Sequence, residues 1–266
     1  MVRAHRATER ANLMPARRFY ASPDDISSTV RLSIDETHHL TRVLRLVPGD
    51  QAFVFDGCGN EYECKFSLVT DNRAQLEIVE RLFGIVESPL QLTLAQALPK
   101  GEKFDFIVQK ATELGVTRIA PLVTRYSEVR LDEQQVARRL QRWQRISLEA
   151  LKQCGRRKLV EITAPRKVAE FLCDEAHSQK QALLLFSERD GAPLEEALDE
   201  ISMPRSVVAL VGPEGGWADD ELDLLKQHDS RGLTLGPRVL RTETAALVAI
   251  TLIQHALGDL SRKGEE

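Results

Sequence analysis

The sequence predicts an α/β protein with helices on both faces of a parallel sheet, preceded by a small β-barrel. Three observations lead to this fold class. The first third of the chain contains mainly short segments with alternating apolar residues, as strands do. From about residue 87 onward, apolar segments alternate with segments of helical periodicity. The change falls at Glu87-Ser88-Pro89. Repeated strand–helix alternation is typical of parallel sheets with helices on both faces.

The N-terminal part is expected to form a barrel of five strands with one helix. The strands are expected at 17–21, 30–32, 51–55, 61–70 and 73–83. A helix is expected at 35–46, with Asp35 as its N-cap and Pro48-Gly49 as its end. Closure of the sheet would remove its exposed edges. We therefore expect a barrel domain at 14–86, after a polar, Arg-rich extension at 1–13 that is expected to be disordered.

The second domain is expected at 87–266 and contains six strand–helix pairs. Its strands are expected at 91–98, 118–123, 159–163, 182–186, 206–211 and 233–235. Its helices are expected at 103–114, 132–155, 167–176, 193–201, 218–229 and 242–260. The last helix is apolar on nearly every side, which is typical of a buried helix.

Composition narrows the class of protein. The chain has 266 residues, of which 42% are hydrophobic, and a formal net charge of −4, so we expect a globular protein. No apolar stretch is long enough to span a membrane. The four cysteines form no C-x-x-C pair and have no histidine cluster nearby, so no metal is expected and a reducing, cytoplasmic location is favoured.

Charge is distributed unevenly along the chain. Residues 138–158 include eight Lys and Arg against the single acid Glu149. Such a run indicates either a local anion-binding surface or a solvated helix face, and charge alone leaves both open.

Candidate binding residues follow three of the expected strands, because ligands of parallel α/β sheets bind beyond the carboxyl ends of the strands. These segments are Phe186-Ser187-Glu188, G-P-E-G-G at 212–216 and L-G-P-R-V-L-R-T-E-T at 235–244. Glycines let the backbone approach a ligand, and helix N-termini supply amide donors. The chain lacks the G-x-G-x-x-G dinucleotide fingerprint, the P-loop, H-E-x-x-H and G-x-S-x-G.

The two glycine-containing motifs together resemble the S-adenosylmethionine site of the SPOUT methyltransferases. More narrowly, the chain resembles the RsmE family, which makes N3-methyluridine in 16S ribosomal RNA. Further matching stretches are R-R-F-Y (17–20), H-H-L-x-R-V-L-R (38–45), K-G-E-K-F-D-F-I-V-Q-K-A-T-E-L-G-V (100–116) and E-A-x-K-Q-C-G-R (149–156). The resemblance covers about residues 16–260. It implies a trefoil-knotted domain, a homodimer, an N-terminal PUA-like RNA-binding barrel and a small-ribosomal-subunit substrate.

The resemblance also assigns roles to residues. The cofactor S-adenosyl-L-methionine is expected to bind Phe186, Ser187, Glu188, Gly212, Pro213, Glu214, Gly215, Gly216, Leu235, Gly236, Leu240, Arg241 and Thr242. Catalysis is expected to involve Arg241, as a stabiliser of charge on a uridine oxygen, and Glu243, as a base. Phosphate and base contacts are expected from Arg17, Arg18, Lys100, Lys103, Gln153, Arg156 and Arg157.

Several alternatives stay open at this point. Arg241 could instead pair with a phosphate or with Glu243, and Glu243 could only offset the helix dipole. A 2′-O-ribose or guanine-N1 methyltransferase of the same fold is the nearest other activity. A non-catalytic ribosome-assembly factor would be expected to have damaged cofactor loops, whereas the three segments here match the pattern. A nicotinamide dehydrogenase is disfavoured by the missing fingerprint.

Overall fold

The computed structural model describes residues 17–84, 87–127, 132–175, 181–188, 191–193, 196 and 204–261. The chain forms two compact units. The first unit consists of Met1–Glu87 with Leu148–Leu159, and the second of Ser88–Ser147 with Val160–Glu266. The expected domain ranges place 148–159 in the second domain, whereas its contacts place this segment in the first unit. The expected extension at 1–13 and most of the expected helix at 193–201 lie outside the described residues.

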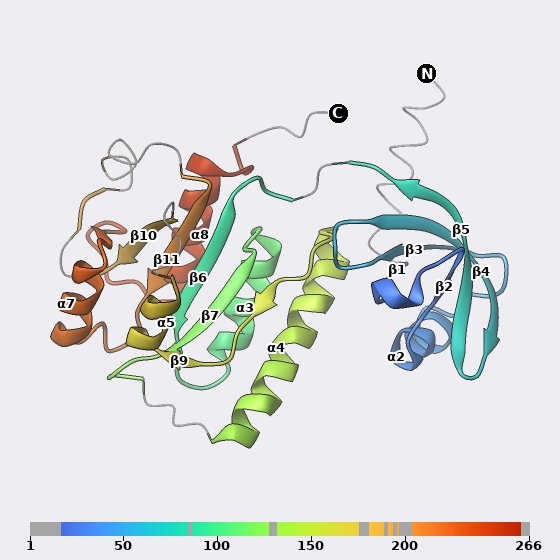
Figure 1. Ribbon diagram of the computed structural model, residues 1–266, viewed down its shortest axis with the longest axis horizontal. Coiled ribbons are helices and arrows are strands. Elements are labelled where there is room, and N and C mark those ends of the chain that lie inside the picture. The colour runs from blue at the N-terminus through green and yellow to red at the C-terminus, as the bar shows by residue number, and fades with distance from the viewer. Residues whose placement is uncertain are drawn as a thin grey trace. The chain divides into compact units, whose positions relative to one another are not determined.

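The first unit contains one curled five-stranded sheet with short helical segments (Figure 1). Its strands are β1 (Arg18–Tyr20), β2 (Thr29–Arg31), β3 (Gln51–Phe55), β4 (Glu61–Thr70) and β5 (Arg73–Leu82). Their order is β1-β3-β4-β5-β2; β1 and β3 are parallel, and the other pairs are antiparallel. The strands agree with the expected ones, but β1 and β2 are the two ends of the sheet, so the pairing of the described residues does not close it into a complete ring.

The helix of the first unit begins earlier than the sequence suggested. It consists of α2 (Ile34–His38) followed directly by a π-helical turn, η3 (His39–Val43), and a short 3-10 turn, η2 (Pro23–Asp25), precedes both. The expected N-cap Asp35 is wrong: the Ser33 hydroxyl accepts a hydrogen bond from the Glu36 amide at 3.1 Å and caps the helix. Leu40 packs into the core with Phe19, as the apolar spacing requires.

The second unit contains a parallel seven-stranded sheet (Figure 1). Its strands are β6 (Gln91–Ala97), β7 (Arg118–Val123), β8 (Glu161–Ile162), β9 (Arg166–Lys167), β10 (Gln181–Phe186), β11 (Ser206–Val211) and β12 (Arg231–Leu233). The order is β12-β10-β11-β6-β7-β8, and β9 also pairs with β7. Its helices are α3 (Lys103–Glu113), the first part of α4 (Glu133–Cys154), α5 (Val168–Glu175), α7 (Asp219–Gln227) and α8 (Thr242–Leu257). The described part therefore follows the predicted strand–helix alternation.

Helices cover both faces of this sheet, and the alternation of strand side chains shows it. On β11, Val207 and Ala209 belong to one buried cluster, with α3, α4 and α8. Val208 and Leu210 belong to a second cluster, with α5 and α7. Burial on both sides explains why the strands are continuously apolar. The trefoil knot implied by the resemblance stays a prediction.

The last helix, α8, is buried on one face only. Ala246, Ala249, Ile250 and Ile253 are fully buried against the sheet and α3. The opposite face is exposed in the described chain, with Leu252 at 38%. The predicted burial of this helix is therefore confirmed for the face that packs on the sheet and α3, whereas the described chain leaves the opposite face uncovered.

Candidate functional site

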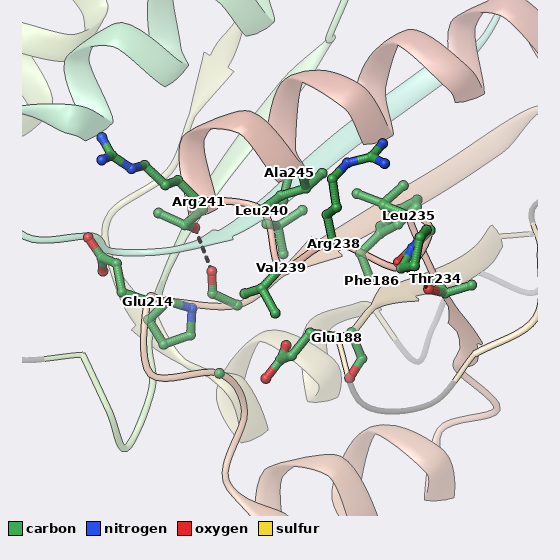
Figure 2. A pocket seen from close by; sticks show the side chains of 18 residues that line it. Phe186, Glu188, Glu214, Thr234, Leu235, Arg238, Val239, Leu240, Arg241 and Ala245 are labelled. Atoms are coloured by element: carbon green, nitrogen blue, oxygen red, sulfur yellow. Dashed lines mark hydrogen bonds between the residues drawn. The ribbon is translucent and has the colours of Figure 1, made fainter.

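A cavity of about 690 Å³ lies where β10, β11 and β12 end (Figure 2). Its volume is within the range of small-ligand pockets. Twelve of the thirteen expected cofactor residues line it: Phe186, Ser187, Glu188, Gly212, Pro213, Glu214, Gly216, Leu235, Gly236, Leu240, Arg241 and Thr242. Gly215 is outside the lining, and a Cβ there would meet the Tyr126 side chain at 3.0 Å. The parallel strands thus bring three segments, distant in sequence, to one place.

The wall of the cavity is chemically mixed. Phe186, Leu235 and Leu240 give it apolar surface, and the carboxyl groups of Glu188 and Glu214 give it negative charge. In Figure 2 the Glu188 and Val239 side chains both lie at the centre of the site. A pocket with these properties fits a ligand that combines an aromatic ring with a cationic group.

The G-P-E-G-G segment is folded tightly around its glycines. The amide of Gly216 donates to the Pro213 carbonyl at 3.0 Å. Gly216 has φ +72°, and a Cβ at this position would approach the Glu188 carboxylate to 2.5 Å. Only glycine adopts this backbone conformation at low cost, so the close approach of this loop to Glu188 depends on Gly216.

A buried chain of hydrogen bonds joins two of the pocket loops. The Thr242 hydroxyl donates to the Gly212 carbonyl at 2.6 Å, drawn as a dashed line in Figure 2. The same hydroxyl oxygen accepts from Gln96 Nε2 at 2.9 Å. Gln96 is the penultimate residue of β6 and is completely buried. The first turn of α8 is thereby connected to the end of β11.

Lys103, at the start of α3, is placed between two carboxylates. Its Nζ donates to Glu214 Oε1 at 2.7 Å and lies 3.6 Å from Glu243 Oε2, which is an ion-pair distance but too long for a good hydrogen bond. The hydrogen bond to Glu214 raises the pKa of Lys103. Burial by itself would raise the pKa of Glu214, but the hydrogen bonds from Lys103 and from backbone amides outweigh it and lower that pKa. Lys103 and Glu214 are therefore both charged at neutral pH.

The two catalytic candidates are placed differently. Arg241 lines the cavity and is the N-cap of α8, and in Figure 2 its guanidinium points away from the centre of the site. Glu243 is outside the lining, and its side chain is 18% exposed beside Lys103. Of these two residues, only Arg241 is in a position to reach a ligand in the cavity.

Three expected RNA contacts are buried inside the first unit. Arg18 Nε donates to Glu61 Oε1, and its other nitrogens donate to the carbonyl oxygens of Leu151 and Arg156. Arg157 Nε donates to the other carboxylate oxygen of Glu61 at 2.9 Å. These two arginine side chains, at 0% and 7% exposure, share a carboxylate that is 0% exposed.

Arg156 has a comparable internal role. Its side chain is 7% exposed, and it forms an ion pair with Glu87 at 2.9 Å. Glu87 also accepts from the backbone amide of Arg157 at 2.8 Å and from that of Lys158 at 2.9 Å. The expectation that Arg18, Arg156 and Arg157 meet RNA phosphates therefore disagrees with their positions, because each guanidinium bonds groups of its own unit.

The other expected RNA contacts are more accessible. Gln153 and Lys100 are exposed, and Arg17 and Lys103 are half-buried. On the part of α4 within the second unit, Arg138 and Arg145 are also exposed. The basic run thus divides into buried and solvent-facing members, which its sequence could not distinguish.

Three lining residues lie outside the segments that the sequence indicated: Val211, Thr234 and Ala245. Three more, Pro237, Arg238 and Val239, lie inside the predicted binding segment at 235–244 but were given no individual role. Gln96 was missed because it does not touch the cavity; its place at the end of β6, beside the strands that form the site, was the available signal.

No helix within the described residues is long and apolar enough to cross a membrane. Among the same residues, no group of three or more His, Cys, Asp or Glu is arranged to hold a metal ion.

A comparison with known families defines the class of protein first. A family model described as "RNA methyltransferase domain" matches residues 86–254, and one described as "RNA methyltransferase PUA domain" matches residues 33–79. The parallel sheet with its pocket and the curled N-terminal sheet are thus those of an RNA methyltransferase with a PUA domain.

Individual relatives narrow the class further. Ribosomal RNA small subunit methyltransferase E of Synechocystis is 35% identical over 248 residues, which cover 93% of this chain and 80% of the relative. The chain therefore belongs to the ribosomal RNA small subunit methyltransferase E family, which confirms the resemblance found in its sequence.

Two solved structures of similar proteins contain the same small molecule. The Neisseria gonorrhoeae member of this family, bound to S-adenosyl methionine, superposes with a TM-score of 0.82 at 34% identity, covering 92% of this chain and 99% of that one. A methyltransferase of Legionella pneumophila, in complex with the cofactor SAM, superposes with a TM-score of 0.83 at 34% identity, covering 91% of this chain and 98% of that one.

Proposed function

We propose that the chain transfers a methyl group from S-adenosylmethionine to N3 of a uridine in small-subunit ribosomal RNA. The observation that carries this proposal is the convergence of the segments at 186–188, 212–216 and 234–242 on one pocket, in a chain of this family. Two solved relatives hold S-adenosylmethionine. The choice of uridine N3, rather than a ribose or guanine, comes from the motif resemblance.

The residues of the pocket fit the cofactor chemically. Phe186, Leu235 and Leu240 offer apolar surface suited to the adenine ring, and Glu188 and Glu214 offer negative charge suited to a sulfonium. The cationic side chains Arg238 and Arg241 suit a carboxylate. When bound, S-adenosylmethionine supplies a methyl group that its own positive charge activates.

The chain must then make uridine N3 a nucleophile. The N3 proton has to leave, and charge develops on the neighbouring uridine oxygens. We assign Arg241 to stabilise that charge, because this residue lines the cavity and its guanidinium is permanently cationic. Because N3 is on the pairing edge, the base must be unpaired or extruded before it can enter the site.

We assign Glu243 a charge-pairing role instead of that of a base. It lies in the first turn of α8, where a carboxylate offsets the helix dipole, and its Oε2 is 3.6 Å from Lys103 Nζ. Glu214 is a poor proton acceptor as well, since its pKa is lowered by its hydrogen bonds. In this proposal Glu214 binds the cofactor, and the proton leaves to solvent.

RNA binding is proposed for exposed cations near the site and for polar groups elsewhere. In the second unit, Arg238 and Lys100 are exposed. In the first unit, Gln153 is exposed, whereas the buried arginines are left out of the proposal. Phosphate contacts of this kind would make binding weaken steeply with salt.

The protein is also proposed to act as a homodimer in the cytoplasm, where ribosomal RNA is found. The support is the half of α8 that the described chain leaves uncovered, which includes Leu252 at 38% exposure. A Leu252→Asp variant should then sediment as a monomer, while wild type sediments as a dimer. A wild-type monomer would contradict this part of the proposal.

The experiment that tests the activity uses methyl-labelled S-adenosylmethionine and small ribosomal subunits that lack the modification. After digestion of the RNA, we expect the label in N3-methyluridine. Label in a ribose or in guanine would keep the enzyme class and overturn the specificity. Wild-type protein that neither binds the cofactor nor transfers the label would overturn the function and support the non-catalytic assembly factor.

A further inference from the structure

A completely buried glutamine is bonded beside the pocket without touching the cavity. Gln96 has 0% exposure, and its Nε2 donates to the Ala97 carbonyl at 2.9 Å and to Thr242 Oγ1 at 2.9 Å. A third oxygen, the carbonyl of Val211, is at 3.5 Å. A carboxamide nitrogen has two hydrogens, so the two short bonds use both of them.

The orientation of this carboxamide is dictated by its surroundings. Two of the oxygens around Nε2 belong to backbone carbonyls, which cannot donate. A flipped carboxamide would place its oxygen against them. The Oε1 atom accepts no hydrogen bond and is buried, and leaving a buried acceptor unpaired costs stability. The carboxamide keeps this orientation because the hydrogen bonds that Nε2 donates outweigh the cost of leaving Oε1 without a donor.

The direction of the hydrogen bonds continues through Thr242. Its hydroxyl accepts from Gln96, and so its own hydrogen is directed to the Gly212 carbonyl at 2.6 Å. Thr242 is the first residue of α8 and directly follows Arg241, the N-cap. Gly212 directly follows β11. The chain of donors thus sets the position of two walls of the cavity relative to each other.

We propose that Gln96 is a positioning residue for the methyl-donor pocket, acting through the Thr242 hydroxyl on Gly212 and on the first turn of α8. The inference rests on the proposed function, because it takes S-adenosylmethionine as the ligand. Gln96 itself touches no ligand, as it does not line the cavity. Its effect is to hold the backbone that does, and to place Arg241 at the edge of the site.

The test is a double-mutant cycle measured as S-adenosylmethionine affinity by calorimetry. Gln96→Met keeps the approximate length of the side chain and removes its donors, and Thr242→Val removes the hydroxyl. We expect each single change to weaken affinity about tenfold, in line with the loss of a buried hydrogen bond. Because both lie on one chain of bonds, the double variant should be within about threefold of the weaker single variant.

A matched control separates positioning from general loss of stability. Gln254, on α8, is also completely buried, and its side chain bonds Ser88 and the Gly115 carbonyl, away from the cavity. Gln254→Met should lower the unfolding midpoint and leave the affinity within about twofold of wild type. An affinity loss in this control equal to that of Gln96→Met would overturn the proposal.

A second variant tests the direction of the hydrogen bonds. In Gln96→Glu, a protonated carboxyl can donate to Thr242, whereas an ionised one faces three oxygens and donates to none. The affinity of this variant relative to wild type should therefore rise as the pH falls from 8 to 5. A ratio that does not change with pH would contradict the donor role.

The outcomes distinguish this proposal from the proposed function. If wild type does not bind S-adenosylmethionine, the proposed function fails, and this inference fails with it. If wild type binds and Gln96→Met binds equally well, only the positioning role is overturned. Single effects that multiply in the double variant would likewise exclude action through Thr242.

Discussion

The pocket loops of the second unit and the basic segment at 148–159 of the first unit differ in how well their sequences predicted ligand-binding positions. Both were selected from the sequence as ligand-binding. The loops converge on one cavity, and all but one of their expected residues line it. In the basic segment, Arg156 and Arg157 instead bond carboxylates inside their own unit. A loop that follows a parallel strand must lie at the carboxyl edge of the sheet. The charge of an arginine, in contrast, does not indicate which group it pairs with in the folded chain.

The glycine-containing loops and the arginines differ in what determines where their binding groups lie. A glycine loop acts through its backbone, and the strand before it determines where the backbone is. An arginine has a long side chain that reaches whichever carboxylate is nearest in the folded chain. Glu61 and Glu87 are distant in sequence from the arginines that they pair with, so no local pattern reveals the pairing.

The largest effect is expected from breaking the buried pair in the first unit. Glu61→Gln removes the carboxylate charge shared by Arg18 and Arg157, leaving two buried guanidinium groups undercompensated. Breaking a buried pair in this way costs about 3–5 kcal/mol of unfolding free energy. Denaturant unfolding measures the loss. The exposed Glu77 on β5 provides the control, with Glu77→Gln expected to change stability by about 0.5 kcal/mol or less. Equal effects would mean that the arginines are not held internally.

Arg241 is expected to dominate catalysis among the cations of the pocket. Arg241→Lys removes the planar donor and should lower the rate of methyl transfer at saturating cofactor about 10²–10³-fold, as the loss of an oxyanion-stabilising donor does. Arg238→Lys changes another exposed arginine of the same lining and should lower the rate by less than about tenfold. Single-turnover transfer to ribosomal subunits measures both rates. Similar losses in the two variants would remove the special role of Arg241.

A smaller effect is expected from the ion pair at the mouth of the pocket. The lowered pKa of Glu214 stabilises the fold above the unfolded-state value of about 4.3, and this contribution is lost as pH falls through the folded-state pKa. The raised pKa of Lys103 stabilises the fold below the unfolded-state pKa of about 10.4. This stabilisation is lost as pH rises through the folded-state pKa. Lys103→Met should therefore flatten the decline of the thermal midpoint on the acid side.

This change is expected to be modest and sensitive to salt, because Lys103 is accessible to solvent. Lys110→Met removes a similarly exposed pair with Glu113 on α3 and controls for the loss of an ordinary ion pair. If both variants alter the acid profile equally, the bond to Glu214 has no particular importance.

The smallest effect concerns the thiols. Burial raises the pKa of Cys64 to about 12, whereas Cys58 and Cys173 are exposed. Because the thiolate is the reactive form, Cys64 should not react with a thiol reagent at pH 8 until the first unit unfolds. Time-resolved thiol titration should show two fast groups first. Rapid reaction of all four cysteines would contradict the burial of Cys64.

The ends of the elements show how far local sequence reasoning reaches. The strand at 61–70 was predicted with its observed bounds because apolar residues alternate along it. The helix start at Asp35 was wrong because Ser33 caps the helix two positions earlier. The S-x-x-E pattern of Ser33 and Glu36, which is typical of helix N-termini, was the signal in the sequence. The two-residue strand β9 was missed, since a pairing this short with β7 leaves no periodic signal.

By itself, the sequence determined the alternation of strands and helices, the membership in an RNA methyltransferase family and the three loops that form the pocket. These depend on periodicity and on glycine-containing motifs, which are local properties of the chain. Only the tertiary structure decided which arginines are buried, that α8 leaves the face with Leu252 uncovered, and that Gln96 bonds Thr242. The bonds of Arg156 to Glu87, of Arg157 to Glu61 and of Gln96 to Thr242 join residues 69, 96 and 146 positions apart in the sequence, and the folding of the chain brings them together.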